Sequence, residues 1–239
     1  MNCKGTAYIL PIMILFLLTR PALPVENSPE KAKVKKAKTN YNMTYYHDSR
    51  GFKTLEFLTF TNDIPGGFNL FGFTNFHGTQ KSSAFDFDLT THFIEYRLRR
   101  PVPKEHFFGI SGISGEIEYN DFTGADNNVL RIGVTYKMTL PFLKGSFLQL
   151  RALPYETDGS GSFAGLVFGL RFGEKAFLSG FYDLHINKDT PNRIVSEAEV
   201  GYQIFHQFRL VMEARYNGFE DANPLLDGTG VAFGVKFLP

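Results

Sequence analysis

The sequence predicts an all-β fold: a transmembrane, antiparallel, up-and-down β-barrel of about 12 strands. Residues 1–25 have the layout of an export signal peptide, with Lys4, a short apolar run and then Pro21 and Pro24. No later stretch reaches the roughly 20 continuous apolar residues that a membrane-spanning helix needs. From Tyr41 onward, apolar and polar residues alternate with a period of two, and Gly, Pro, Asn and Asp interrupt this alternation at regular intervals.

Composition and charge narrow the class further. The sequence has 26 Phe, 11 Tyr, 23 Gly and no Trp, which favours short strands and tight turns. Its one cysteine, Cys3, lies in the predicted signal, so we expect no disulfide in the exported chain. Residues 26–38 are lysine-rich and lack aromatic residues, which predicts a flexible periplasmic tail. Residues 39–239 carry 18 basic and 22 acidic side chains, a balance that argues against binding nucleic acid.

One continuous barrel domain is predicted over residues 39–239, because no linker divides this part of the chain. Turn-forming residues separate the predicted strands. The predicted strands span residues 40–47, 53–61, 67–77, 85–98, 107–120, 127–140, 145–154, 162–172, 175–186, 192–204, 208–218 and 229–238.

The composition of the two strand faces distinguishes a membrane barrel from a soluble sandwich. In LRIGVTYKMTL, residues 130–140, every other residue is apolar, and the residues between them include Arg131, Gly133 and Lys137. FRLVMEARYNG, residues 208–218, repeats this pattern. Arginine, glutamate and glycine together suit a confined polar interior, whereas the polar face of a soluble sandwich meets bulk water. A soluble all-β protein is the alternative to a bacterial outer-membrane barrel.

The connections between strands predict the orientation of the barrel. Those after the first, third and every second strand thereafter are polar, acidic and mostly long, whereas the other set is shorter and more basic. Long outer loops and short periplasmic turns are typical of bacterial barrels, so we expect both chain ends in the periplasm. A three-residue turn at 205–207 would place Glu197 opposite Arg215 and Glu199 opposite Glu213.

The polar face supplies the candidate solute-contacting residues, whose charges are nearly balanced. Such a lumen suits a neutral polar solute better than an ion, because ion-selective pores carry rows of one charge sign. The alternative is that the charges pair with one another and close the lumen. The charged candidates for contact with a solute are Glu56, Glu116, Glu118, Arg131, Arg151, Arg171, Asp183, Glu197, Glu199, Glu213 and Arg215, and the same face also carries Lys137, His185, Arg209 and Lys236.

Two aromatic residues complete the predicted binding set. Phe163 and Phe181 fall on the same face as Arg171 and Asp183, in neighbouring predicted strands. A ring beside hydrogen-bonding groups suits a flat solute such as a nucleobase or a sugar, although such rings more often serve only for packing.

Catalysis is not predicted. The sequence contains neither a G-x-S-x-G nor an H-E-x-x-H motif, and nothing in it points to a cofactor or a metal. A serine–histidine pair on the barrel wall, as in outer-membrane phospholipases, is the enzymatic alternative. Its candidates are Ser179 with His185 and Ser49 with His47.

The opening NYNMTYYHDSRGFKTLEF, which includes Glu56, and the closing GVAFGVKF resemble the nucleoside-specific outer-membrane channels of the Tsx type. The resemblance covers the arrangement of strands over residues 39–239. It implies a narrow, monomeric pore that sits in outer-membrane lipid and passes nucleosides, with aromatic and polar residues lining the path.

Overall fold

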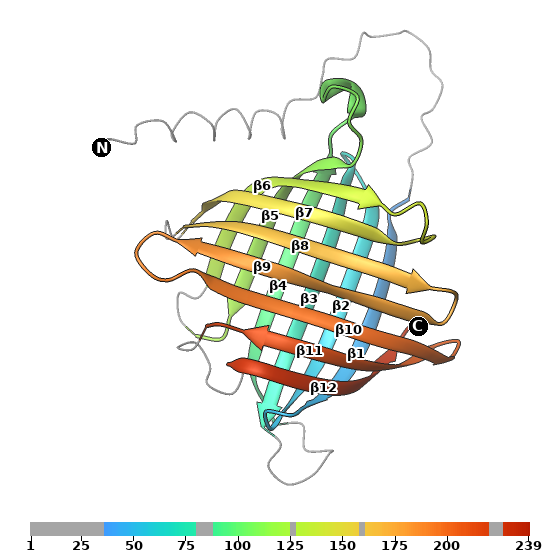
Figure 1. The fold of residues 1–239 in the computed structure, drawn as a ribbon, viewed down its shortest axis with the longest axis vertical. Coiled ribbons are helices and arrows are strands. Elements are labelled where there is room, and N and C mark those ends of the chain that lie inside the picture. Colours follow the sequence, from blue (N-terminus) through green and yellow to red (C-terminus); the bar gives the residue numbers. More distant parts are fainter. Residues whose placement is uncertain (1–35, 80–87, 125–127, 158–160, 220–226) are drawn as a thin grey trace.

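The computed structural model describes residues 36–79, 88–124, 128–157, 161–219 and 227–239. Within these residues, 12 strands form a closed barrel in which each strand pairs with the next and β12 pairs back onto β1 (Figure 1). The strands are β1 (Lys38–Asp48), β2 (Phe52–Ile64), β3 (Phe68–Thr79), β4 (Leu89–Pro101), β5 (Ile113–Phe122), β6 (Asn128–Thr139), β7 (Phe147–Glu156), β8 (Gly161–Phe172), β9 (Ala176–Asn187), β10 (Arg193–Phe205), β11 (Phe208–Asn217) and β12 (Gly228–Phe237). The predicted fold class is confirmed.

The distribution of polar and apolar side chains is the reverse of that in a soluble protein. Large apolar side chains such as Leu210 and Phe233 are 53% and 61% exposed, whereas Glu116 and Lys53 are fully buried. Charged residues are almost never buried in water-soluble proteins unless they are paired. The apolar face of each strand therefore points outward, where a bilayer would cover it, and the charged face points into the lumen. Among the described residues, no helix is long and apolar enough to span a membrane.

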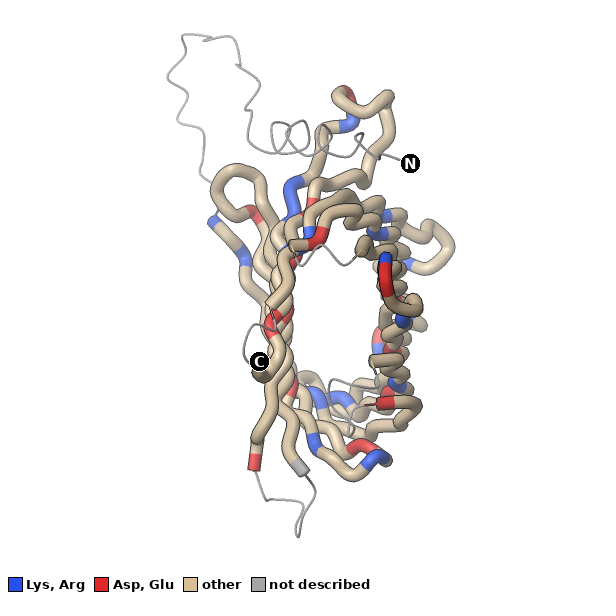
Figure 2. The backbone as a smooth tube through the Cα atoms, turned by 90° about the vertical axis from the view of Figure 1, so that its left-hand side faces the viewer, with Lys and Arg blue, Asp and Glu red and all other residues tan. Residues whose placement is uncertain are grey.

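The two ends of the barrel carry different connections. We call the end with the β2–β3, β4–β5, β6–β7, β8–β9 and β10–β11 connections the turn end, and the opposite end the loop end. Charged residues lie all around the wall between them (Figure 2). The predicted signal peptide, residues 1–25, and most of the predicted tail lie outside the described residues. Lys38, which the prediction assigned to the tail, is the first residue of β1.

The predicted fifth strand begins too early. The prediction placed its start at residue 107, but β5 begins at Ile113. Residues Lys104–His106 form a short 3-10 helix instead, and Phe108, Gly109 and Gly112 have positive φ angles, which an extended strand does not contain. The connection at residues 102–112 is therefore long, although the sequence pattern predicted only short connections at this end.

The register between β10 and β11 agrees with the prediction over most of its length. Glu197 lies opposite Arg215 and Glu199 lies opposite Glu213. The turn differs from the predicted three-residue turn at 205–207, because Phe205 belongs to β10 and pairs directly with Phe208. A register shift between Gln203 and Phe205 accommodates the additional residue in β10.

The seam where the barrel closes is shorter than the other strand pairs. β12 pairs with β1 only from Met43 to Asp48. β1 starts earlier and pairs with β2 from Lys38 onward. Residues 38–42 of β1 therefore extend past the end of β12 at the turn end.

Replacement of Gly133 tests whether β6 and β7 approach too closely at this position for any side chain. Gly133 lies at the register shift between β6 and β7, where an added Cβ would be 2.1 Å from the carbonyl oxygen of Ala152. We expect Gly133→Ala to lower the free energy of unfolding by about 1–3 kcal/mol, because backbone atoms would have to move. Urea titration of the detergent-folded protein measures this. At Gly169 the added Cβ would meet only the ring of Phe147, so Gly169→Ala should cost less. Equal losses in the two variants would contradict this explanation.

Candidate functional site

The strongest group of lumen charges lies on β4 to β9, and we call it the wall cluster. Its members are Glu95, Arg97, Arg99, Glu116, Glu118, Arg131, Arg151, Glu156 and Asp183. Arg151 is at its centre, with a fully buried side chain. Its Nη2 atom is 2.8 Å from Oε1 of Glu116 and also contacts Glu118, and its Nη1 atom is 3.7 Å from Oδ1 of Asp183. One arginine thus compensates three buried carboxylates.

Glu118 links Arg151 to the neighbouring arginines of the wall cluster. Its Oε1 atom is 2.8 Å from Nη1 of Arg131, and its Oε2 atom is 3.1 Å from Nε of Arg97. Nε of Arg131 reaches onward to Oε2 of Glu156 at 2.8 Å. Because the members share partners in this way, removing any one of them affects several others.

Phe163 fills the space between two arginines of the wall cluster. Its ring centroid is 4.7 Å from Cζ of Arg151 and 5.3 Å from Cζ of Arg131. The neighbouring residue on the inner face of β8 is Gly165, where an added Cβ would be 2.5 Å from Oδ1 of Asp183. A glycine is therefore required there for Asp183 to reach the cluster.

A second group of charges lies around the closing seam, on β10, β11, β12, β1 and β2, and we call it the seam cluster. Its members are Tyr46, Asp48, Arg50, Glu56, Glu199, Glu213, Arg215 and Lys236. Nζ of Lys236 is 2.5 Å from Oε1 of Glu199, and the hydroxyl of Tyr46 donates a hydrogen bond to the same carboxylate. Arg215 contacts Glu213, and its Nη1 atom is 3.5 Å from Oδ2 of Asp48. Each of the ion pairs named here joins two residues of the same cluster.

A cavity of about 580 Å³ lies inside the barrel towards the turn end. It begins beside Asn62, Asn69 and Pro101, near the ends of three strands, and extends inward to Tyr46 and Glu56. Both aromatic and hydrogen-bonding side chains line it, among them Phe60, Phe71, Phe73, Phe147, Phe181, Gln149 and Ser179. A cavity of this size and mixed lining is typical of a small-molecule site.

The predicted site residues fall into four places. Glu116, Glu118, Arg131, Arg151, Phe163 and Asp183 lie in the wall cluster, and Glu56, Glu199, Glu213 and Arg215 lie in the seam cluster. Glu197 and Phe181 line the cavity from neighbouring positions on β10 and β9. Arg171 joins neither cluster, because it lies exposed one residue before the turn-end terminus of β8. Their role in binding a solute stays a prediction.

Several lumen residues were missed at the sequence level. Glu95, Arg97 and Arg99 on β4 belong to the wall cluster. The signal was present, because these residues alternate with Ile94, Tyr96 and Leu98, and the same rule that placed Arg131 inward applies to them. Tyr46 and Asp48 on β1 were also missed, and both are buried inside the barrel.

The proposed serine–histidine pairs have very different positions. Ser179 and His185 lie on the same strand six residues apart, which separates them by about 20 Å and excludes them as a catalytic pair. The ring of His185 instead packs against Phe163 and Phe219. His47 is on the outward side of β1 at the loop end, and Ser49 lies exposed in the turn that follows Asp48, whose side chain is inside. Oγ of Ser49 accepts a hydrogen bond from the Val231 backbone. Among the described residues, no group of three or more His, Cys, Asp or Glu side chains could hold a metal ion.

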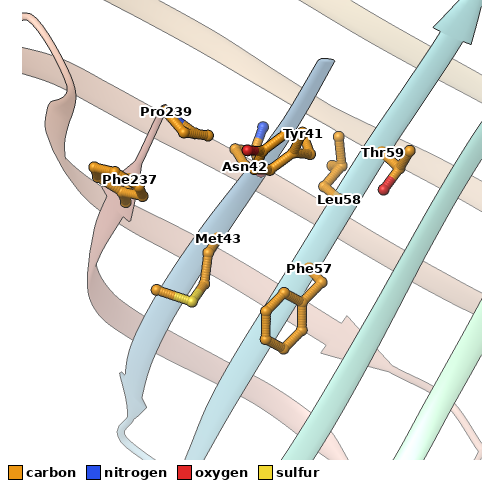
Figure 3. A pocket seen from close by; sticks show the side chains of 8 residues that line it. All are labelled: Tyr41, Asn42, Met43, Phe57, Leu58, Thr59, Phe237 and Pro239. Carbon is orange, nitrogen blue, oxygen red and sulfur yellow. The ribbon is translucent and has the colours of Figure 1, made fainter. Parts of the chain in front are cut away.

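A second cavity, of about 390 Å³, lies at the seam near the turn end. Figure 3 shows its lining by β1, β2 and the end of the chain: Tyr41, Asn42, Met43, Phe57, Leu58, Thr59, Phe237 and Pro239. Its position beside the end of β1 that does not pair with β12 and its mostly apolar lining place it on the lipid-facing side of the barrel.

No known family model matches the sequence, and no curated protein matches it significantly. Among solved structures, the KdgM porin in complex with disordered oligogalacturonate is 14% identical, with a TM-score of 0.50 over 84% of this chain and 98% of that one. Outer membrane phospholipase A from Escherichia coli is 16% identical, with a TM-score of 0.51 over 95% of this chain and 96% of that one. At these identities the likeness concerns the fold alone. The shared fold and the apolar outer surface together make the chain a bacterial outer-membrane β-barrel.

Proposed function

We propose that the protein is a narrow channel for small, uncharged polar solutes, with nucleosides as the first candidates. The observation that supports this most is the cavity of about 580 Å³ inside the barrel. A barrel with a purely structural role needs no such cavity. Phe71 and Phe181 offer faces for a planar base, and Gln149 and Ser179 offer hydrogen bonds to a sugar.

The proposed path continues from the cavity to the loop end between the wall cluster and the seam cluster. Because each named ion pair lies within one cluster, a solute moving between them breaks none of these pairs. Breaking a buried pair costs several kcal/mol, so a path that avoids this is strongly favoured. The two clusters then act as the walls of a constriction. If the clusters instead meet and exclude water, the barrel is a closed structural element.

The proposal includes an orientation and an oligomeric state. The turn end faces the periplasm, because three of its five connections have only two or three residues and short periplasmic turns are typical of bacterial barrels. The barrel closes within one chain, so no second chain is needed to form the wall of the channel, and the proposed unit is a monomer in outer-membrane lipid.

Solute entry into liposomes tests the proposed channel. Liposomes containing the folded protein should take up adenosine faster than protein-free liposomes and should exclude a trisaccharide such as raffinose. Ser179→Trp, inside the cavity, should slow adenosine entry, whereas Ser196→Trp, on the lipid-facing side of β10, should not. Absence of adenosine entry, or equal entry of both solutes, would refute the proposal.

The outward position of His47 and Ser49 gives the enzymatic alternative one specific test. A lipid-hydrolysing barrel needs a nucleophile and a base at the level of the lipid headgroups. Under the channel proposal we expect no release of fatty acid from phospholipid vesicles by the purified protein. Hydrolysis that is lost in both Ser49→Ala and His47→Ala would instead establish a phospholipase.

A further inference from the structure

Cationic and aromatic side chains alternate along the inner wall at the turn end of the barrel. The row runs across β6 to β11 and contains Lys137, Phe147, Arg171, Phe177 and Arg209. We call it the cationic arc. All five residues lie within three residues of the turn-end terminus of their strand, and two of them, Lys137 and Phe147, also line the cavity.

The rings hold the cations in place. Nζ of Lys137 is 4.3 Å from the ring centroid of Phe147, and Cζ of Arg209 is 5.1 Å from that of Phe177. Arg171 is in register with Phe177 on the neighbouring strand. The backbone N–H of Arg171 donates a 2.8 Å hydrogen bond to Oγ of Ser146.

Two glycines make room for these rings. Phe147 pairs with Gly169, where an added Cβ would be 2.6 Å from the ring. Phe177 pairs with Gly201, where the distance would be 2.2 Å. Each ring therefore lies across a glycine of the next strand and is fixed against the wall.

A ring carries no formal charge, so it does not compensate the charge of the cation that packs on it, whereas a carboxylate does. Within the described residues, neither Lys137, Arg171 nor Arg209 forms an ion pair, and Nε of Arg209 is buried without a hydrogen-bond partner. Lys236 provides the contrast. It lies 5.6 Å from the Phe177 ring but is neutralised by Glu199. The arc is therefore a row of positive charges that form no ion pair among the described residues, and rings position two of them.

We propose that the cationic arc binds small organic anions, with their carboxylate or phosphate group on Lys137 or on Arg209 and their planar part against the ring that packs on that cation, Phe147 or Phe177. This extends the proposed function to anionic solutes and rests on it for any role in transport. Binding itself requires no open path through the barrel.

Equilibrium binding to the folded protein in detergent tests this, measured by calorimetry with AMP and adenosine as a matched pair. The two ligands differ only in the phosphate group. We expect AMP to bind about 10-fold more tightly than adenosine, because each charge-assisted contact adds affinity. Raising the salt concentration from 50 to 300 mM should remove most of that difference, because exposed charges are screened.

A pair of matched variants locates the effect. In Lys137→Gln/Arg209→Gln, the ratio of the AMP affinity to the adenosine affinity should fall close to 1. Lys188→Gln/Arg193→Gln removes one lysine and one arginine at the loop end instead and should retain the wild-type ratio. Equal affinity for AMP and adenosine, or equal loss in both double variants, would overturn the proposal. Intact AMP preference in a protein that passes no solute would refute only the proposed channel.

Discussion

Replacement of Arg151 by methionine is expected to lower the free energy of unfolding by about 3–5 kcal/mol. Arg151 is fully buried and compensates Glu116, Glu118 and Asp183. Methionine fills a similar volume without charge, so these carboxylates would lose their central partner while staying out of contact with water. The loss of the ring contact with Phe163 adds to the cost. Urea-dependent unfolding, followed by heat-dependent gel mobility, measures the change.

Two controls separate charge compensation from general damage. Arg171→Met removes an exposed arginine and should change stability by no more than about 0.5 kcal/mol. Adding Asp183→Asn to Arg151→Met should restore part of the lost stability, because Arg151 is the only ion-pair partner of Asp183 among the described residues and its carboxylate would otherwise stay buried and unpaired. An Arg151→Met protein that unfolds at the wild-type urea concentration would show that the wall cluster does not stabilise the barrel.

Removal of the side chains of Glu118 and Arg151, which contact each other in the wall cluster, is expected to widen the constriction between the two clusters. Glu118→Ala/Arg151→Ala deletes two long side chains from the wall cluster, and water should fill the polar space that they leave. We expect the single-channel conductance in planar bilayers to rise by about threefold or more, because conduction follows the narrowest cross-section of a pore. Glu118→Gln/Arg151→Gln also removes both charges but keeps more of the side-chain volume. It should therefore increase the conductance less.

Folding of the alanine double variant is verified by gel mobility before the recordings. Unchanged conductance in a correctly folded Glu118→Ala/Arg151→Ala barrel would place the narrowest point of the path elsewhere. A rise of the same size in both double variants would assign the effect to charge and not to volume.

Local pattern in the sequence was enough to predict the barrel and the faces of its strands. Alternation placed Arg131 and Glu213 inward and Leu210 outward, because successive side chains of a strand point to opposite sides. The pairing of Glu197 with Arg215 followed from one hairpin. The start of β5 could not be predicted in this way, because Phe107 and Phe108 continue an aromatic pattern and yet belong to a connection that bends at Gly109.

The division of the lumen charges into two clusters could not be read from the sequence. It depends on the stagger of neighbouring strands around the closed barrel, which decides the residues that share a level. Arg151 illustrates this. It is on β7, but it contacts Glu116 on β5 and Asp183 on β9, each two strands away. The same candidate lumen residues were compatible with a plugged lumen and with a solute path.

Current through single barrels, with a cysteine placed in the cavity, tests the central claim most directly. Since Cys3 is the only cysteine in the sequence, Ser179→Cys places a unique thiol in the cavity of the exported chain, and Ser196→Cys places one on the lipid-facing side. If the cavity lies on a conducting path, a bulky water-soluble thiol reagent should reduce the Ser179→Cys current by more than about half. The Ser196→Cys current should not change. Absence of any current, or a Ser179→Cys current that the bound reagent leaves unchanged, would contradict a channel through this cavity.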